Sequence, residues 1–186
     1  NIAGASLALT TIDGKVESGR VVSSGDSFFW AGSLKLNRSL ISSQSRIYLS
    51  VTNALLDNGA ASSNTLTTGD GFFLTRKPAT GDLLGTKFQS TAPGFAMVTH
   101  LWAGRNDGVS PAGFANNVAM GTLALIPQGS DPLFVFSGTG TDNGLYTDVL
   151  DLSQLLDYSS QLQVDPNLTI YYAAAKLSFT PPVACA

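Results

Sequence analysis

Charged side chains are scarce in this chain. Asp, Glu, Lys and Arg make up 12% of its 186 residues, about half of the roughly 25% found in an average soluble domain. The net charge is −3, and the ten Lys and Arg residues are dispersed without forming a basic stripe. Because nucleic-acid binding depends on clustered cations that contact phosphates, we expect no nucleic-acid partner for this segment.

Long apolar runs and targeting signals are also missing. No stretch approaches the roughly 18 consecutive apolar residues that a membrane span needs, so we predict no membrane span. The start, "NIAGASLALTTIDG", has neither the basic region nor the apolar region of a secretory signal, and it begins on Asn. We therefore interpret the sequence as a processed form or a fragment of a longer chain.

Residues for nucleophilic catalysis are equally few. Cys185 is the only cysteine, so no intrachain disulfide framework can form, and His100 is the only histidine. The Gly-Asp-Ser of "SSGDSFFW" occurs around the serine of two hydrolase groups, but the order of Ser27 and His100 fits neither. Alternation in "FAMVTHLWA" places His100 in a strand as a packing residue. We predict no catalytic residue, no enzyme activity and no cofactor.

Oxygen ligands for a metal are present without a recognisable spacing. Asp142, Asp148 and Asp151 are donors of the type that calcium selects, but their spacing is not that of an EF-hand, and turn formation or helix capping also accounts for them. The sequence leaves calcium binding open. It also leaves open whether the glycosylation sequons at Asn37 and Asn167 are used.

Period-two alternation is the dominant pattern that is present. In "RIYLSV", Ile47, Leu49 and Val51 share one face, and "NLTIYYAAAKLSF" is long enough to be a principal last strand. The Asp13-Gly14 dipeptide within "IDGK" at 12–15 predicts a tight hairpin turn. We predict an all-β fold, an antiparallel β-sandwich or jelly roll, with a barrel as the alternative. The expected strands are 5–12, 15–22, 27–36, 46–51, 71–76, 95–103, 118–126, 133–137 and 167–179.

Only one segment has helical periodicity. In "DVLDLSQLLDYSS", Val149, Leu152 and Leu156 recur at three- and four-residue spacing, and Asp151 followed by Gln154 resembles a capping box. We predict one short helix here, before the last strand. No repeat of 20–50 residues and no low-complexity linker is evident, so residues 1–186 are expected to form a single domain.

Three long stretches, 53–70, 77–94 and 104–117, are expected to contain no strand, and loops of such length commonly carry function. The third follows "VTHLWAGRNDGVSP", where an arginine fork and two acceptors come directly after an aromatic residue. Sugars bind to such sets, because their ring faces stack on aromatic rings and their hydroxyls bond to polar side chains. We predict a ligand site at Trp102, Arg105, Asn106 and Asp107; the alternative is a turn whose polar residues meet only water.

The Ser-, Thr-, Gly- and Ala-rich β pattern, the low charge and the closing strand "TIYYAAAKLSFTPPV" resemble the shell or projecting domains of small non-enveloped virus capsid proteins. The chain lacks the basic arm of shell proteins that package RNA. The resemblance implies a non-catalytic structural domain on a virion surface that forms homo-oligomers and contacts a host receptor or glycan. The alternative is a secreted or cell-surface carbohydrate-binding module or adhesin, which would be extracellular.

Overall fold

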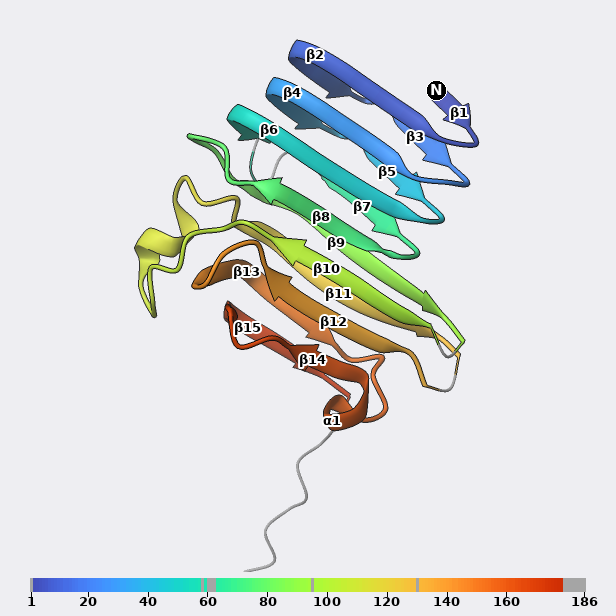
Figure 1. Cartoon of the computed structure of the whole chain (residues 1–186), viewed down its shortest axis with the longest axis vertical. Coiled ribbons are helices and arrows are strands. Elements are labelled where there is room, and N and C mark those ends of the chain that lie inside the picture. The colour runs from blue at the N-terminus through green and yellow to red at the C-terminus, as the bar shows by residue number, and fades with distance from the viewer. Residues whose placement is uncertain (1, 58, 60–62, 95, 130, 179–186) are drawn as a thin grey trace, which may run out of the picture.

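The chain forms two parallel β-sheets that face each other (Figure 1). The computed structural model describes residues 2–57, 59, 63–94, 96–129 and 131–178. All pairings between the named strands are parallel. The predicted antiparallel sandwich or jelly roll is therefore wrong, although the all-β character is confirmed. Alternation of apolar and polar residues shows that one face of a strand is buried. The same alternation occurs whether the neighbouring strands are parallel or antiparallel, so it does not predict strand direction.

The odd-numbered strands form one sheet and the even-numbered strands form the other. The eight-stranded sheet has the order β1 (Ile2–Gly4), β3 (Arg20–Ser23), β5 (Leu40–Ser43), β7 (Asn64–Thr68), β9 (Leu83–Pro93), β11 (Met120–Gln128), β13 (Asn143–Leu152) and β15 (Leu168–Leu177). The seven-stranded sheet has the order β14 (Leu162–Val164), β12 (Leu133–Gly138), β10 (Met97–Trp102), β8 (Gly71–Arg76), β6 (Arg46–Leu56), β4 (Ser27–Asn37) and β2 (Leu7–Glu17).

This strand order is that of a solenoid. The chain passes from one sheet to the other and back, so that each turn of the coil adds one strand to each sheet beside the previous turn. Parallel strands in one sheet normally need a long crossover connection. Here the strand of the opposite sheet serves as that connection, which explains how a parallel fold arises almost without helices.

The solenoid implies a repeat that the sequence inspection missed. Leu7 pairs with Ser27, and Ser27 with Ile47, so equivalent positions are 20 residues apart in the first turns. The next turn is longer, since Ile47 pairs with Phe72. The expectation of no 20–50-residue repeat is wrong, because turns of unequal length obscure the period and the repeated positions share only a chemical type.

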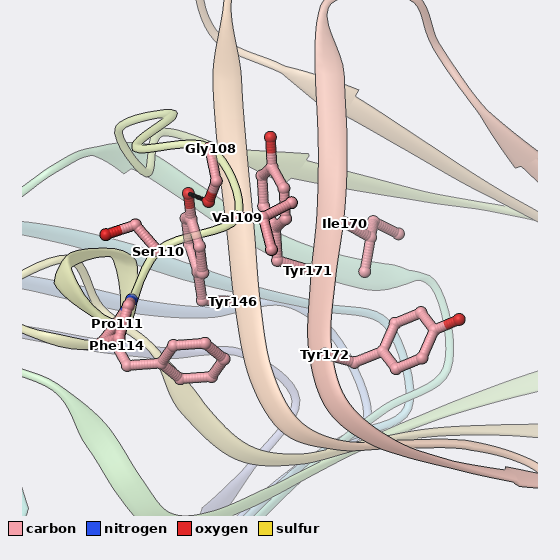
Figure 2. A pocket seen from close by; sticks show the side chains of 9 residues that line it. All are labelled: Gly108, Val109, Ser110, Pro111, Phe114, Tyr146, Ile170, Tyr171 and Tyr172. Atoms are coloured by element: carbon pink, nitrogen blue, oxygen red, sulfur yellow. Dashed lines mark hydrogen bonds between the residues drawn. The ribbon is translucent and has the colours of Figure 1, made fainter.

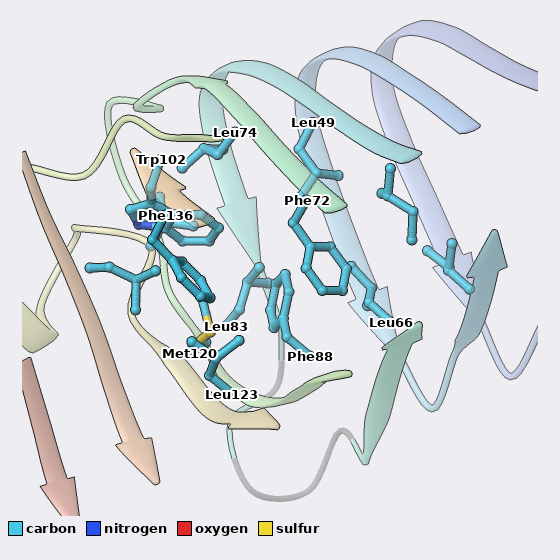
Figure 3. Close-up of a cluster of buried hydrophobic side chains, with 14 of the residues drawn as sticks. Leu49, Leu66, Phe72, Leu74, Leu83, Phe88, Trp102, Met120, Leu123 and Phe136 are labelled. Atoms are coloured by element: carbon cyan, nitrogen blue, oxygen red, sulfur yellow. The ribbon is translucent and has the colours of Figure 1, made fainter. Parts of the chain in front are cut away.

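Apolar side chains from both sheets fill the space between them (Figure 3). Phe72 of β8 packs edge-on against Phe88 of β9, with ring centroids 4.8 Å apart, and Trp102 of β10 also meets Phe88 edge-on at 6.0 Å. These three residues are at most 2% exposed. Contacts between strands of different sheets therefore hold the two layers together through burial of aromatic surface.

Buried hydroxyl groups mark one corner of the coil. Ser23, Ser43, Thr68 and Ser90 pair in register along consecutive strands of the eight-stranded sheet, and each is at most 2% exposed. The Ser23 and Ser43 hydroxyls both bond to the carbonyl oxygen of Gly25, at 2.7 Å each. The Ser23, Ser43 and Thr68 hydroxyls thus satisfy backbone groups where the chain bends from one sheet to the other, whereas the Ser90 hydroxyl is buried without a hydrogen-bond partner among the described residues.

Four aromatic rings stack on the outer face of the seven-stranded sheet. Phe28 lies against Tyr48 with centroids 4.6 Å apart, Tyr48 against Phe73 at 4.9 Å, and Trp30 against Phe28 at 5.0 Å. Phe28, Tyr48 and Phe73 occupy the same register position in successive turns. The parallel register itself therefore brings these like side chains together.

The predicted helix is misplaced. Residues 148–152, where it was expected to begin, belong to β13, whereas α1 (Tyr158–Gln161) starts later, with Asp157 as its N-cap in place of Asp151. The Asp157 carboxylate accepts a hydrogen bond from the Ser159 backbone N–H at 2.9 Å. The expectation of a short helix before the last strand is otherwise confirmed.

Other local expectations have mixed outcomes. The hairpin turn at 12–15 is wrong, because β2 continues through Asp13 and Gly14. Two of the three stretches expected to lack strands contain β7 and β9, while 104–117 contains only the 3₁₀ helix η2 (Pro111–Phe114). Among the described residues, no helix is long and apolar enough to cross a bilayer.

Candidate ligand-binding site

The connection from β10 to β11, residues 103–119, is folded against the outer side of β13 and β15. The carboxylate of Asp82 fixes its second half, because it accepts hydrogen bonds from the backbone N–H groups of Asn116 (2.6 Å), Asn117 (3.0 Å) and Ala119 (3.0 Å). Asn116 and Val118 have positive φ angles of 53° and 58°. A β-branched residue in this region is rare, which indicates that surrounding contacts impose the path of the loop.

A buried amide joins the two halves of the loop. The Asn117 side chain is fully buried; its Oδ1 accepts from the Arg105 N–H at 2.7 Å, and its Nδ2 donates to the Arg105 carbonyl at 2.8 Å and the Gly113 carbonyl at 3.2 Å. All the hydrogen-bonding groups of this amide are therefore used inside the loop. The result is a closed unit with its own internal bonds.

Tyr146 of β13 is the residue around which the loop closes. Its hydroxyl accepts from the Asp107 N–H at 2.8 Å and donates to the Gly108 carbonyl at 2.9 Å (Figure 2). The ring leaves no room for a side chain at Gly113, where a Cβ would lie 2.0 Å from a ring carbon. Tyr146 is fully buried, and this burial raises the pKa of its hydroxyl.

Tyr171 of β15 lies against the other side of Tyr146. The ring centroids are 4.6 Å apart and the planes differ by 14°. The Tyr171 hydroxyl donates to Asn106 Oδ1 at 2.8 Å, and Asn106 Nδ2 donates to Asp142 Oδ1 at 2.6 Å. Since β15 is the last strand of its sheet, the ring face of Tyr171 that points away from Tyr146 lies at the open edge.

These elements surround an apolar groove of about 560 Å³. Figure 2 shows the loop residues on one side of it and the Tyr146 and Tyr171 rings side by side; Ile170 and Tyr172 project from the opposite side of β15. We call this the tyrosine groove, and it is lined by Gly108, Val109, Ser110, Pro111, Phe114, Tyr146, Ile170, Tyr171 and Tyr172. Val109 is 98% exposed, so the groove is open to solvent at the loop.

Three of the four predicted ligand-binding residues lie in the loop beside this groove. Arg105 and Asp107 pair with each other, with a distance of 2.6 Å between Nη2 and Oδ2. Hydrogen bonding to Arg105 lowers the pKa of the Asp107 carboxyl, which keeps it ionised. Asn106 joins the loop to Tyr171. These side chains hold the loop in place, and the Arg105 side chain remains 52% exposed.

The fourth predicted residue, Trp102, does not reach the groove. It is 1% exposed and packs in the core between the sheets. The aromatic surface of the groove comes instead from Tyr146, Tyr171 and Phe114, which the sequence prediction did not include. The only signal in the sequence is the pair Tyr171 and Tyr172 in the last strand, and no local pattern links this pair to residues 103–119.

His100 is a packing residue, as predicted. It is 2% exposed, its Nδ1 accepts from the Phe72 N–H at 3.1 Å, and its ring stacks on Phe136 with centroids 4.3 Å apart. Complete burial lowers its pKa to about 3. The imidazole is therefore neutral at ordinary pH and has no access to a substrate at the surface.

The aspartates considered for calcium do not converge. Asp142 bonds to Asn106, Asp151 bonds to Ser153 and lies 3.8 Å from Lys176, and partial burial raises the pKa of the Asp148 carboxyl. No group of three or more His, Cys, Asp or Glu residues suited to a metal occurs in the part of the chain that the structure describes.

Both sequon asparagines have engaged side chains. Asn37 Nδ2 donates to Glu17 at 3.0 Å, and Asn167 Nδ2 donates to the carbonyl groups of Gly138 and Gly140, at 2.9 Å each. Glycosylation replaces one amide hydrogen, so Asn167 would lose one of its two hydrogen bonds, whereas Asn37 would have one N–H left for Glu17.

Comparison with known proteins gives no further guide to the site. No protein-family model, no curated protein and no solved structure matches the chain. The function must therefore be argued from the geometry of the groove.

Proposed function

We propose that the chain is a non-catalytic interaction domain that binds carbohydrate in the tyrosine groove. The observation that carries the proposal is the open ring face of Tyr171, held parallel to Tyr146 in an apolar groove at the edge of the sheet. The C–H face of a pyranose ring is apolar and planar enough to pack on such a face. Its hydroxyls then point to the rim of the groove.

Polar groups suited to those hydroxyls lie on the loop of residues 103–119, which borders the groove. The exposed Arg105 guanidinium offers donors, and the Ser110 hydroxyl accepts from the Ala112 N–H at 3.2 Å, which leaves its own hydrogen free to donate. Ligand sites commonly combine a largely apolar lining of roughly 300–1,000 Å³ with a few fixed polar groups. The groove has this composition, and the internal bonds of the loop preorganise it, which lowers the entropy lost on binding.

The absence of catalysis in this proposal rests on the chemistry of the groove. The single histidine is buried with a pKa of about 3, and the carboxyl nearest the groove, Asp107, has a lowered pKa and is paired with Arg105. A general acid needs a raised pKa, which this carboxyl does not have. The surface setting, whether a virion or another extracellular assembly, stays a prediction.

Glycan-array screening followed by titration calorimetry tests the proposal. We expect binding of neutral oligosaccharides, and a several-fold to roughly tenfold loss of affinity in Tyr171→Ala, in line with the ~0.5–1.5 kcal/mol that ring stacking contributes. Trp30→Ala is the control, since Trp30 is 44% exposed but lies on the other sheet. An array without signal at millimolar glycan, or equal effects of the two substitutions, would show the proposal to be wrong.

A further inference from the structure

The edge strand β15 is unusual because it is long and has little protection from the residues that the structure describes. It is ten residues long, and none of the described strands pairs with its outer side. An unpaired strand edge is a template for another strand, and natural proteins protect such edges with charge, proline, bulges or short length. β15 contains one charged residue, Lys176, and no proline.

The other edges of the two sheets are protected. β1 and β14 have only three residues each. β2 has 11 residues, one more than β15, but it contains Asp13, Lys15 and Glu17, and an ion pair joins Lys15 to Glu17 at 2.5 Å. The two ends of the solenoid therefore differ, and only the end at β15 presents a long edge of low charge.

Exposed apolar side chains gather at the same end. Tyr172 and Leu177 of β15 are each 53% exposed, and Val164 of the neighbouring edge strand β14 is 39% exposed. Solenoids need covered ends, because a terminal turn has no neighbour on one side. The short helix α1 packs mainly against β14 and β12, and its Tyr158 hydroxyl bonds to Ser178, directly after β15.

We propose that β15 pairs antiparallel with β15 of a second copy and joins two solenoids tail to tail. A two-fold axis brings identical edges together, so strands of ten residues match over almost their full length. Head-to-tail stacking would instead place β15 against the three residues of β1. The continuous pairing of backbone groups supplies the affinity, as in other cases of strand addition.

The order of side chains in β15 fits this arrangement. The first half contains Ile170, Tyr171 and Tyr172, and the second half contains the run Ala173–Ala175. In an antiparallel pair centred on Ala173, Tyr171 and Tyr172 of one copy lie opposite Ala175 and Ala174 of the other. Large side chains therefore meet small ones, which avoids clashes across the seam and leaves space beside the Tyr171 ring.

Dimerisation would also affect ligand binding without being required for it. The two tyrosine grooves would flank one two-fold axis on the same extended sheet, so a branched or repeating glycan could engage both. Binding of the second site then becomes intramolecular and the overall affinity rises. Sugar binding can be measured in the monomeric Ala174→Lys variant and dimerisation in sugar-free protein, so the two proposals can fail separately.

Sedimentation velocity over a range of protein concentrations tests the dimer. We expect a species of twice the 19.3 kDa of one chain, and a shift to the monomer in Ala174→Lys, which places a charge on the exposed seam. Thr10→Lys on β2 is the matched control and should leave the dimer intact. Circular dichroism checks that both variants keep the β spectrum of the parent chain.

Cysteine cross-linking gives a second measurement. In a Cys185→Ser background, Ala173→Cys lies near the middle of β15 and should form a covalent dimer under mild oxidation, whereas Thr10→Cys should not. Three results would overturn the proposal: a parent chain that is monomeric at all concentrations, a mass that grows beyond the dimer as expected for head-to-tail stacking, or a dimer that Thr10→Lys dissociates and Ala174→Lys does not.

Discussion

The ring of Tyr146 is enclosed between the loop at Gly113 and the ring of Tyr171, whose centroid lies 4.6 Å away. The path of the loop at Gly113 therefore depends on Tyr146, which lies 33 positions later in the chain. The groove depends on this contact, and several consequences can be measured.

Substitution of Gly113 should disrupt the loop without unfolding the solenoid. A Cβ there would lie 2.0 Å from the Tyr146 ring, so Gly113→Ala must displace the loop or the tyrosine, at a cost of roughly 1–3 kcal/mol. We expect a lower melting temperature and loss of glycan affinity. Gly140→Ala is the control, because its Cβ would meet nothing closer than 3.4 Å. Equal stability of the two variants would argue against the packing described here.

Removal of the Asp82 carboxylate should loosen residues 103–119 selectively. Three backbone N–H groups of the loop would lose their acceptor in Asp82→Ala. We expect faster hydrogen–deuterium exchange at Asn116, Asn117 and Ala119, with unchanged exchange in the strands distant from the loop. Asp131→Ala, at an exposed position, should leave the exchange of the loop as it is.

Thr68→Val tests the buried hydroxyl corner. The Thr68 hydroxyl lies 2.5 Å from the Ser45 carbonyl and accepts from the Gly71 N–H at 2.9 Å. Valine keeps the volume but leaves these buried groups unpaired, so we expect a loss of about 1–3 kcal/mol in the free energy of unfolding. Urea denaturation measures it. Thr67→Val, on the outer face of the same strand, should change the stability much less.

His100 should make stability depend on pH below its ordinary pKa. The unfolded chain binds a proton at His100 below pH 6.5, but the folded chain binds it only near pH 3. Stability therefore falls as the pH is lowered through this window, by up to ~1.4 kcal/mol per pH unit, and is unaffected above it. His100→Phe keeps an aromatic ring between Phe72 and Phe136, and it should flatten the slope between pH 6.5 and 4.5. An unchanged slope would exclude His100 as its source.

The sequence predicted strands well where both faces had a clear pattern. "RIYLSV" lies in β6, and most of the closing segment forms β15. The short strands β5 and β7 were missed because four or five residues cannot establish a period. Sheet direction was also beyond reach, since it depends on which strands become neighbours, and alternation within one strand contains no such information.

A repeat signal was nevertheless present. "VSSGDSFF" at 22–29, "SSQSRIYL" at 42–49 and "TTGDGFFL" at 67–74 occupy equivalent positions in successive turns. Their shared features are a buried hydroxyl residue at the second position, a polar turn, and an aromatic residue followed by an apolar one at the end. On its own, the Gly-Asp-Ser of the first segment suggests a hydrolase motif, whereas alignment of the three segments indicates a coil.

The candidate site was predicted only in part for a related reason. Residues 104–117 were correctly expected to be a long loop beside polar residues, but the aromatic lining comes from Tyr146 and Tyr171. Their hydroxyls bond to the loop across 39 and 65 positions of sequence. Contacts of this range follow from the coil, which was not predicted.

The long connection between β10 and β11 has a wider consequence. Register on both sides of it is set by the neighbouring turns, and β10 and β11 pair with β8, β12, β9 and β13 whatever the length of the segment that joins them. A corner of this kind can accept segments of different length and composition while the rest of the coil keeps its pairing. The binding specificity could therefore change by replacement of this one loop, while the strands of the solenoid stay the same.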